Sequence, residues 1–159
     1  SHLLEKHGIE KNMEWGNAIL SRYPISHRDL HVLSRERKRT ALEATVEIEG
    51  KNLHVFSTHL VYAPIQPSEI QTTQAQNLLK ALPKEHGLVM GNFNTTPDNK
   101  IIDDMNSVMV NTEVDQTKYT ADGKKMDYIF STRDIKILSS GTIDSQASDH
   151  LPVYTIIEL

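Results

Sequence analysis

Short apolar runs separated by polar turns dominate the first half of the chain. Residues 40–48 and 53–60 are rich in Val, Leu and Thr and flank a polar turn at 49–52, a pattern typical of an antiparallel hairpin. A shorter apolar run at 17–21 ends at Tyr23-Pro24. We expect this run to be a buried strand that enters a turn.

Two segments carry helical patterns. The segment 67–82 has most of its apolar positions on one face, and Pro83 ends it. Thr96 is suited to cap the N-terminus of a second helix, because Pro97 then occupies the first helical position, where its missing N–H costs nothing. The sequence therefore predicts a second, short helix over 96–105.

Strand-like runs recur in the second half of the chain. They lie at 88–90, 126–131, 135–138 and 153–158, while residues 106–125 have weak periodicity and are expected to be irregular. Strands and helices interleave without strict βαβ alternation, which favours a mixed-sheet α/β sandwich over a doubly wound parallel sheet. With 159 residues and no linker, the chain is expected to be a single domain over 1–159.

The composition is that of an ordinary globular chain. Hydrophobic residues make up 38% and charged residues 24%, and no apolar run approaches the ~20 residues that span a bilayer. The absence of cysteine removes disulfides, thiol nucleophiles and zinc–thiolate sites. No signal sequence is visible, so the cytoplasm is the default expectation, although a mature secreted chain would look the same.

The net charge is −4, whereas proteins that bind polyanions by electrostatics alone usually carry a basic face. The only dense basic run is 35–39, which we interpret as a solvated loop before a strand. If the protein handles phosphates, we expect a bound cation to do much of the neutralising.

Four polar clusters interrupt the ends of apolar runs: Thr58-His59, Asn92-Phe93-Asn94, Asp127, and Ser148-Asp149-His150. Each by itself is most simply a surface or turn feature. Asp127 is different, because an ionised carboxylate inside a strand is costly unless it is paired. We expect His150 to be its partner, with the aspartate fixing the imidazole tautomer and stabilising its protonated form.

In this order and with these neighbours, the motifs resemble the endonuclease/exonuclease/phosphatase superfamily, the deoxyribonuclease-I-like phosphodiesterases. The resemblance runs from about Trp15 to the end of the chain. It rests on Gly-Asn-Ala-Ile-Leu-Ser-Arg-Tyr-Pro-Ile at 16–25, Ser-Thr-His-Leu at 57–60, Gly-Asn-Phe-Asn-Thr-Thr-Pro at 91–97, Met-Asp-Tyr-Ile-Phe at 126–130 and Ser-Asp-His-Leu-Pro-Val at 148–153.

The resemblance implies divalent-metal-dependent hydrolysis of a phosphodiester or phosphomonoester by in-line attack of an activated water. It implies that His59 contacts the scissile phosphate, that Asn94 positions the water and the phosphate, and that Asp127 and His150 act as a pair. It further implies that Asp149 binds the metal, with Asn92 and Asn94 beside it.

The implied cofactor is Mg²⁺ or Mn²⁺, because these ions suit hard oxygen ligands and the chain has no cysteine. The implied partner is a phosphate-ester substrate, which could be a nucleic acid, a phospholipid or a sugar phosphate. A histidine-based zinc site at His59 and His150 is a further alternative, but no short-spaced ligand pair accompanies them.

The chain departs from the family at Asn92, where the family has an aspartate that orients and deprotonates the attacking water. Asparagine cannot accept that proton, and general-base catalysis is typically worth ~10²–10⁴-fold. An inactivating substitution, a degenerate enzyme or a family branch with another base would each place asparagine here. The alternative function is therefore a catalytically impaired chain that acts as a phosphate-binding or structural module.

A second departure concerns residues 1–14, which match neither of the family's first two strands nor the Gln-Glu that carries its principal metal ligand. We therefore expect a sandwich that is incomplete at its N-terminus. Such a sandwich would expose a sheet edge, and we expect the chain to self-associate through it.

Overall fold

The computed structural model describes residues 16–63, 68–113, 115 and 118–159, so the predictions made for residues 1–14 and for Pro67 lie outside it. The elements in chain order are β1 (Ile25–Ser34), η1 (Glu36–Lys38), β2 (Arg39–Ile48), β3 (Lys51–His59), α2 (Glu69–Ala81), β4 (Gly87–Asn92), α3 (Lys100–Val108), β5 (Val110–Asn111), β6 (Asp127–Ser131), β7 (Lys136–Thr142) and β8 (Val153–Glu158).

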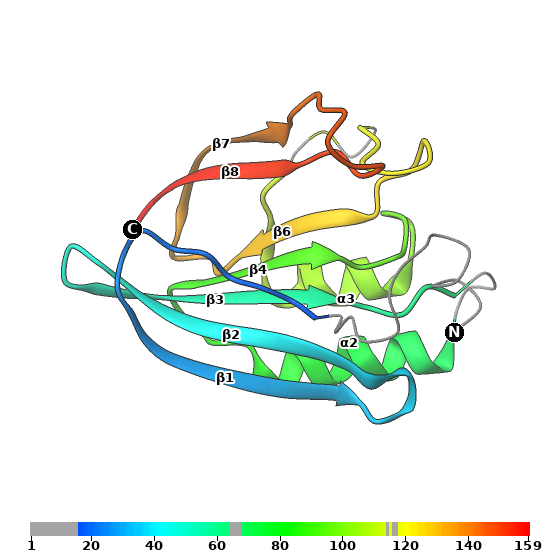
Figure 1. Cartoon of the computed structure of the whole chain (residues 1–159), viewed down its shortest axis with the longest axis horizontal. Coiled ribbons are helices and arrows are strands. Elements are labelled where there is room, and N and C mark those ends of the chain that lie inside the picture. The colour runs from blue at the N-terminus through cyan, green and yellow to red at the C-terminus, as the bar shows by residue number, and fades with distance from the viewer. Residues whose placement is uncertain (1–15, 64–67, 114, 116–117) are drawn as a thin grey trace.

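The described strands form two sheets (Figure 1). A six-stranded mixed sheet has the order β1-β2-β3-β4-β6-β5, and β7 pairs with β8 in a two-stranded sheet. Only β3 and β4 are paired in parallel, with α2 between them in the chain, and the other pairs are antiparallel. The predicted mixed-sheet α/β architecture is confirmed.

Two apolar clusters cover the two faces of the large sheet. On one face, Phe56 and Tyr128 of the sheet pack with Leu78 of α2 and Met105 of α3. The other face belongs to the second cluster, in which β7–β8 residues such as Ile157 pack. Burial on both faces fixes the sheet between a helical layer and the β7–β8 hairpin.

The predicted hairpin is formed by β2 and β3, with Glu47 opposite Asn52. Its turn residues Glu49 and Gly50 both have positive φ, at 51° and 79°. That conformation matches the twist of the flanking strands, and glycine adopts it at little cost.

The predicted buried strand at 17–21 is wrong, because this segment has no regular secondary structure and Leu20 is exposed. The strand instead begins after Pro24, as β1. The sequence pattern did not predict β1, since it is an edge strand with most of its residues exposed and a largely polar composition.

The second helix also begins later than predicted, at Lys100. Asn99 is its N-cap and accepts a hydrogen bond from the Ile101 N–H at 3.0 Å. Thr96 does not cap the helix: its hydroxyl donates to Asp98, and its carbonyl accepts from the Asn99 N–H in a turn that precedes the helix. The expected irregular segment 106–125 contains the last turn of α3 and the short strand β5.

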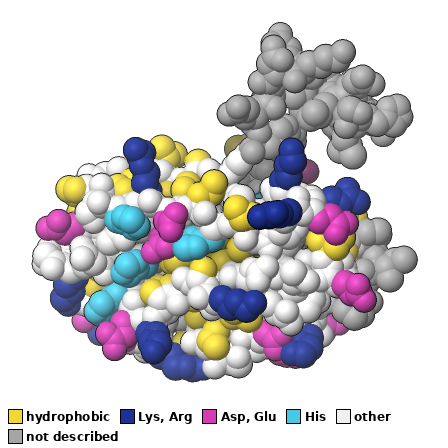
Figure 2. Space-filling model, turned by 90° about the horizontal axis from the view of Figure 1, so that it is seen from below, with side chains coloured by type: hydrophobic (Ala, Val, Ile, Leu, Met, Phe, Trp, Pro, Cys, Tyr) yellow, Lys and Arg dark blue, Asp and Glu magenta, His cyan; other side chains and the backbone are white. Residues whose placement is uncertain are grey.

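On the face of the large sheet that packs against the helices, polar side chains link β1, β2 and β3. Glu43 of β2 pairs with His31 of β1 at 2.7 Å and with His54 of β3 at 3.1 Å. Figure 2 shows histidines and acidic side chains gathered on one part of the molecule, with Lys and Arg spread singly over the same view. Among the described residues of that face, Lys and Arg therefore form no continuous basic surface of the kind a nucleic-acid backbone binds.

Gly91 lies where β3 and β4 approach most closely. Its φ is 142°, and a Cβ at this position would lie 1.9 Å from the carbonyl oxygen of Thr58. Because that neighbour is backbone, a side chain here forces the two strands apart.

We predict that Gly91→Ala destabilises the fold by about 3 kcal/mol or more, from overpacking and backbone strain together. Urea unfolding followed by circular dichroism measures the change. Gly16→Ala is the matched control, because nothing lies within 4 Å of the added Cβ. Equal effects of the two substitutions would show that the close approach is not a constraint.

Candidate active site

Three strand ends bring candidate residues side by side. His59 at the end of β3 is paired with Asn92 at the end of β4, and Asn92 is paired with Asp127 at the start of β6. Directly paired residues point to the same face of a sheet. Since Val55 of β3 and Ile129 of β6 lie in the cluster that packs against β7–β8, this is also the face of His59, Asn92 and Asp127.

The fourth candidate reaches this edge from the other sheet. His150 lies just before β8, and its Nδ1 is 2.8 Å from Oδ2 of Asp127. Both side chains are partly buried, Asp127 more than His150. A carboxylate on Nδ1 holds the proton there and presents Nε2 to a ligand.

Thr120 holds the two members of this pair together, although the sequence pattern gave no sign of it. Its buried hydroxyl accepts from the N–H of Asp127 at 3.0 Å, and its carbonyl accepts from the N–H of Leu151 at 2.7 Å. The adjacent residue, Ala121, forms a β-bridge with His150. A segment expected to be irregular therefore positions Asp127 relative to His150.

His59 lies among three charged or titratable groups. Burial lowers its pKa below the ordinary value of 6.5, the positive charge of Arg39 lowers it further, Asp127 opposes this, and His150 adds to the lowering. His59 is therefore neutral at pH 7. A neutral imidazole still has one N–H donor to offer a phosphate oxygen.

The side chain and the backbone of Asn94 both make hydrogen bonds within the loops at this edge. Its side-chain amide donates to the Leu60 carbonyl at 2.9 Å, and its own N–H donates to Oδ1 of Asn92 at 2.7 Å. Its φ of 52° is a left-handed conformation that asparagine tolerates better than most residues. The two asparagines thus shape the turn after β4.

Gln71 of α2 holds the same turn in place from the helical layer. It is fully buried, and its amide nitrogen lies 3.0 Å from each of the carbonyl oxygens of Val61, Phe93 and Asn94. The apolar pattern correctly placed a buried face on this helix. It could not show that a glutamine on that face binds the loops that follow β3 and β4.

Asp149 is exposed beside this centre, and its Oδ1 accepts a hydrogen bond from Ser148. Within residues 16–63, 68–113, 115 and 118–159, no three His, Asp or Glu side chains are grouped so that they could hold a metal ion. The oxygen of Asn92 already accepts the Asn94 N–H. The described donors therefore do not make a complete metal site.

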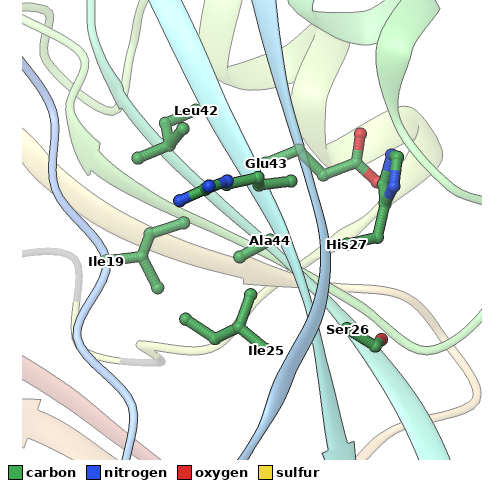
Figure 3. Close-up of a pocket in the computed structure, with 8 residues that line it drawn as sticks. Ile19, Ile25, Ser26, His27, Leu42, Glu43 and Ala44 are labelled. Atoms are coloured by element: carbon green, nitrogen blue, oxygen red, sulfur yellow. The ribbon is translucent and has the colours of Figure 1, made fainter.

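A cavity of about 680 Å³ lies elsewhere, between β1–β2 and the segment before β1. Figure 3 shows Ile19, Ile25 and Leu42 directed toward one space, with His27 and Glu43 on the other side of the strands. None of the candidate catalytic residues lines it. Its lining combines apolar side chains with Ser26, His27, Arg28 and Glu43.

The comparisons with known proteins agree with this architecture. A model of the Endonuclease/Exonuclease/phosphatase family matches residues 3–150, and the chain belongs to that family. No curated protein matches the chain. No helix among the described residues is long and apolar enough to cross a membrane.

Several solved structures share the fold. The human Nocturnin catalytic domain with bound sulfate is 18% identical, with a TM-score of 0.71 over 86% of this chain and 60% of that one. A family protein from Leptotrichia buccalis is 21% identical, with a TM-score of 0.70 over 87% and 63%. Zebrafish (D. rerio) TDP2 complexed with a single-strand DNA product is 16% identical, with a TM-score of 0.68 over 87% and 69%. The chain thus spans about 60% of the first two structures.

We predict that His59 titrates below pH 6.5 in the metal-free protein, measured from its imidazole NMR shifts. Arg39→Gln should raise the pKa and Asp127→Asn should lower it, because the two charges act with opposite sign. A shift in the same direction in both variants would contradict the arrangement. The folded chain binds the His59 proton more weakly than the unfolded chain does. His59 therefore lowers the free energy of unfolding as the pH falls through 6.5.

Proposed function

We propose that this chain hydrolyses phosphate esters, either diesters or monoesters, at the centre formed by His59, Asn92, Asp127 and His150. The observation that carries the proposal is the His150–Asp127 hydrogen bond of 2.8 Å at the strand edge where His59 and Asn92 are paired. Membership of the Endonuclease/Exonuclease/phosphatase family supports it.

The chemistry required is charge stabilisation around phosphorus. When water attacks in line, negative charge builds on the non-bridging oxygens and on the leaving oxygen. In its protonated form, His150 would donate from Nε2 to one such oxygen while Asp127 orients the ring, and neutral His59 would donate to another. Asn92, which lies between His59 and Asp127 in the strand register, would complete the row of side chains that faces the phosphate.

Dependence on Mg²⁺ or Mn²⁺ is part of the proposal, with Asp149 as the carboxylate ligand and Asn92 and Asn94 as the neighbouring oxygens. The described residues do not complete such a site. No catalytic step is therefore assigned to a metal. Hydrolysis rates measured with and without each ion test the dependence.

A phosphate-binding module without turnover is the second candidate, and Asn92 favours it. An amide cannot take a proton from water, and its Oδ1 already accepts the Asn94 N–H at 2.7 Å. The same centre would still bind phosphate through the imidazole donors of His59 and His150. The two candidates differ only in whether attack on phosphorus follows binding.

Hydrolysis of bis(p-nitrophenyl) phosphate with Mg²⁺ or Mn²⁺ separates the two candidates. We expect Asn92→Asp to raise the rate of the native chain by about 10²-fold or more, because it restores a base. Adding His150→Ala to that variant should remove about 10²–10⁴-fold.

The control for this series is His86→Ala in the same background. His86 precedes the opposite end of β4 and is paired with Asp134 at 2.8 Å, so its loss should leave the rate almost unchanged. No activity in any variant would favour the binding module. Equal losses from His86→Ala and His150→Ala would show that the catalytic assignment is wrong.

We also propose self-association through the edge strand β1, which leaves Leu30 57% and Val32 60% exposed. Light scattering should show an average mass that rises with concentration, and Leu30→Lys with Val32→Lys should abolish the rise, because like charges oppose edge pairing. A constant monomer mass up to high concentration would sink the idea.

A further inference from the structure

A cavity of about 310 Å³ opens beside His59, and the basic run of the sequence forms one wall of it. Arg37, Lys38, Arg39 and Thr40 line it together with His59, and Gly16 and Asn17 complete the lining. The Asn17 amide donates to the Thr40 carbonyl at 2.9 Å, which holds the two walls together. The run interpreted as a solvated loop therefore borders the candidate active site.

The turn that carries these cations is strained. Arg37 and Lys38 have φ of 63° and 46°, a left-handed conformation that is unfavourable for two consecutive residues with long side chains. Strain of this kind persists only where surrounding structure imposes it, and it is concentrated at ligand-binding sites. Both residues are exposed, so the turn presents two cations at the rim of the cavity.

Arg39 lies deeper, at the start of β2. It is half-buried, and the loss of solvent lowers the pKa of its guanidinium, with no carboxylate acting against this. Among the described residues, no Asp or Glu forms an ion pair with Arg37, Lys38 or Arg39. A partly desolvated guanidinium without a counter-charge gains most from an anion that brings its own charge.

We propose that this cavity is a second anion subsite, which holds a second phosphate group of the substrate while the ester to be cleaved lies at the His59–Asp127–His150 centre. The proposal rests on the proposed function and narrows its substrate class. The substrate is then an ester with two neighbouring phosphates, in preference to a diester whose other substituents are uncharged or cationic.

His59 belongs to both sites, because it lines the cavity and lies close enough to Asp127 and His150 for their charges to act on it. A ligand that spans the two sites therefore needs its phosphates on adjacent parts of one small molecule or on neighbouring nucleotides. Sugar bisphosphates and nucleoside bisphosphates share this chemistry.

Isothermal titration calorimetry at fixed salt, without metal, tests the subsite with two matched pairs of ligands. The sugar arm compares glucose 6-phosphate with glucose 1,6-bisphosphate, and the nucleotide arm compares thymidine 5′-phosphate with thymidine 3′,5′-bisphosphate. We expect the second phosphate to tighten binding by about 10-fold or more in at least one arm, as for a charge-assisted contact. The arm with the larger gain identifies the source of the substrate.

Arg39→Gln should abolish this gain and leave the affinity for the monophosphate largely intact. Because Arg39 is half-buried and its loss could affect folding, the double variant Arg37→Gln with Lys38→Gln provides a second test at exposed positions. Arg28→Gln is the matched control. Arg28 is exposed on β1 and lines the other cavity, so its loss should not change the gain.

The subsite is overturned if neither bisphosphate binds more tightly than its monophosphate, if neither binds measurably, or if Arg28→Gln reduces the gain as much as the cavity variants do. The proposed function fails separately. Hydrolysis of bis(p-nitrophenyl) phosphate, which has no second phosphate, tests the centre alone. A preference for bisphosphates without hydrolysis supports the subsite and counts against turnover. Hydrolysis without that preference supports turnover and counts against the subsite.

Discussion

The parallel pairing of β3 with β4 is the constraint on which the rest of the site depends. It sets His59 opposite Asn92, and the antiparallel pairing of β6 then adds Asp127 to the same row. The pairing is so close at Gly91 that no side chain fits against the Thr58 carbonyl. Backbone packing one residue away from His59 and Asn92 thus decides which side chains share an edge.

The second requirement is that the loops around this edge stay in place. Polar groups buried beneath them do this, because a buried hydrogen bond left unmade costs more than a made one gains. Gln71 binds the turn that carries Asn94, and Thr120 joins the strand of Asp127 to the segment of His150. These two residues contact no substrate in the proposal, yet they set its geometry.

The electrostatics of the edge favour an anion although the chain as a whole is acidic. The net charge is −4, but Arg39 lies close enough to His59 to lower its pKa, and the neighbouring cations lack carboxylate partners among the described residues. A local concentration of positive charge is what a phosphate responds to at short range, since distant charges are screened. Family membership and this local field point the same way.

Much of the architecture and of the candidate centre could be predicted from the sequence. Alternating and apolar runs identified the β2–β3 hairpin and the helix α2, and a carboxylate inside a strand pointed to the contact between Asp127 and His150. Local pattern is sufficient for these features because burial and turn chemistry are written into neighbouring residues. The family motifs added the expectation that His59 lies at the same centre.

Only the tertiary structure decided the rest. The sequence pattern could not predict the edge strand β1, because an exposed strand needs no apolar pattern. Asn99 rather than Thr96 caps α3, because Thr96 takes part in the turn that precedes the helix. The inward amide of Asn94 and the position of Arg39 beside His59 join residues far apart in the sequence. Such contacts depend on how layers pack, and periodicity along one chain does not encode them.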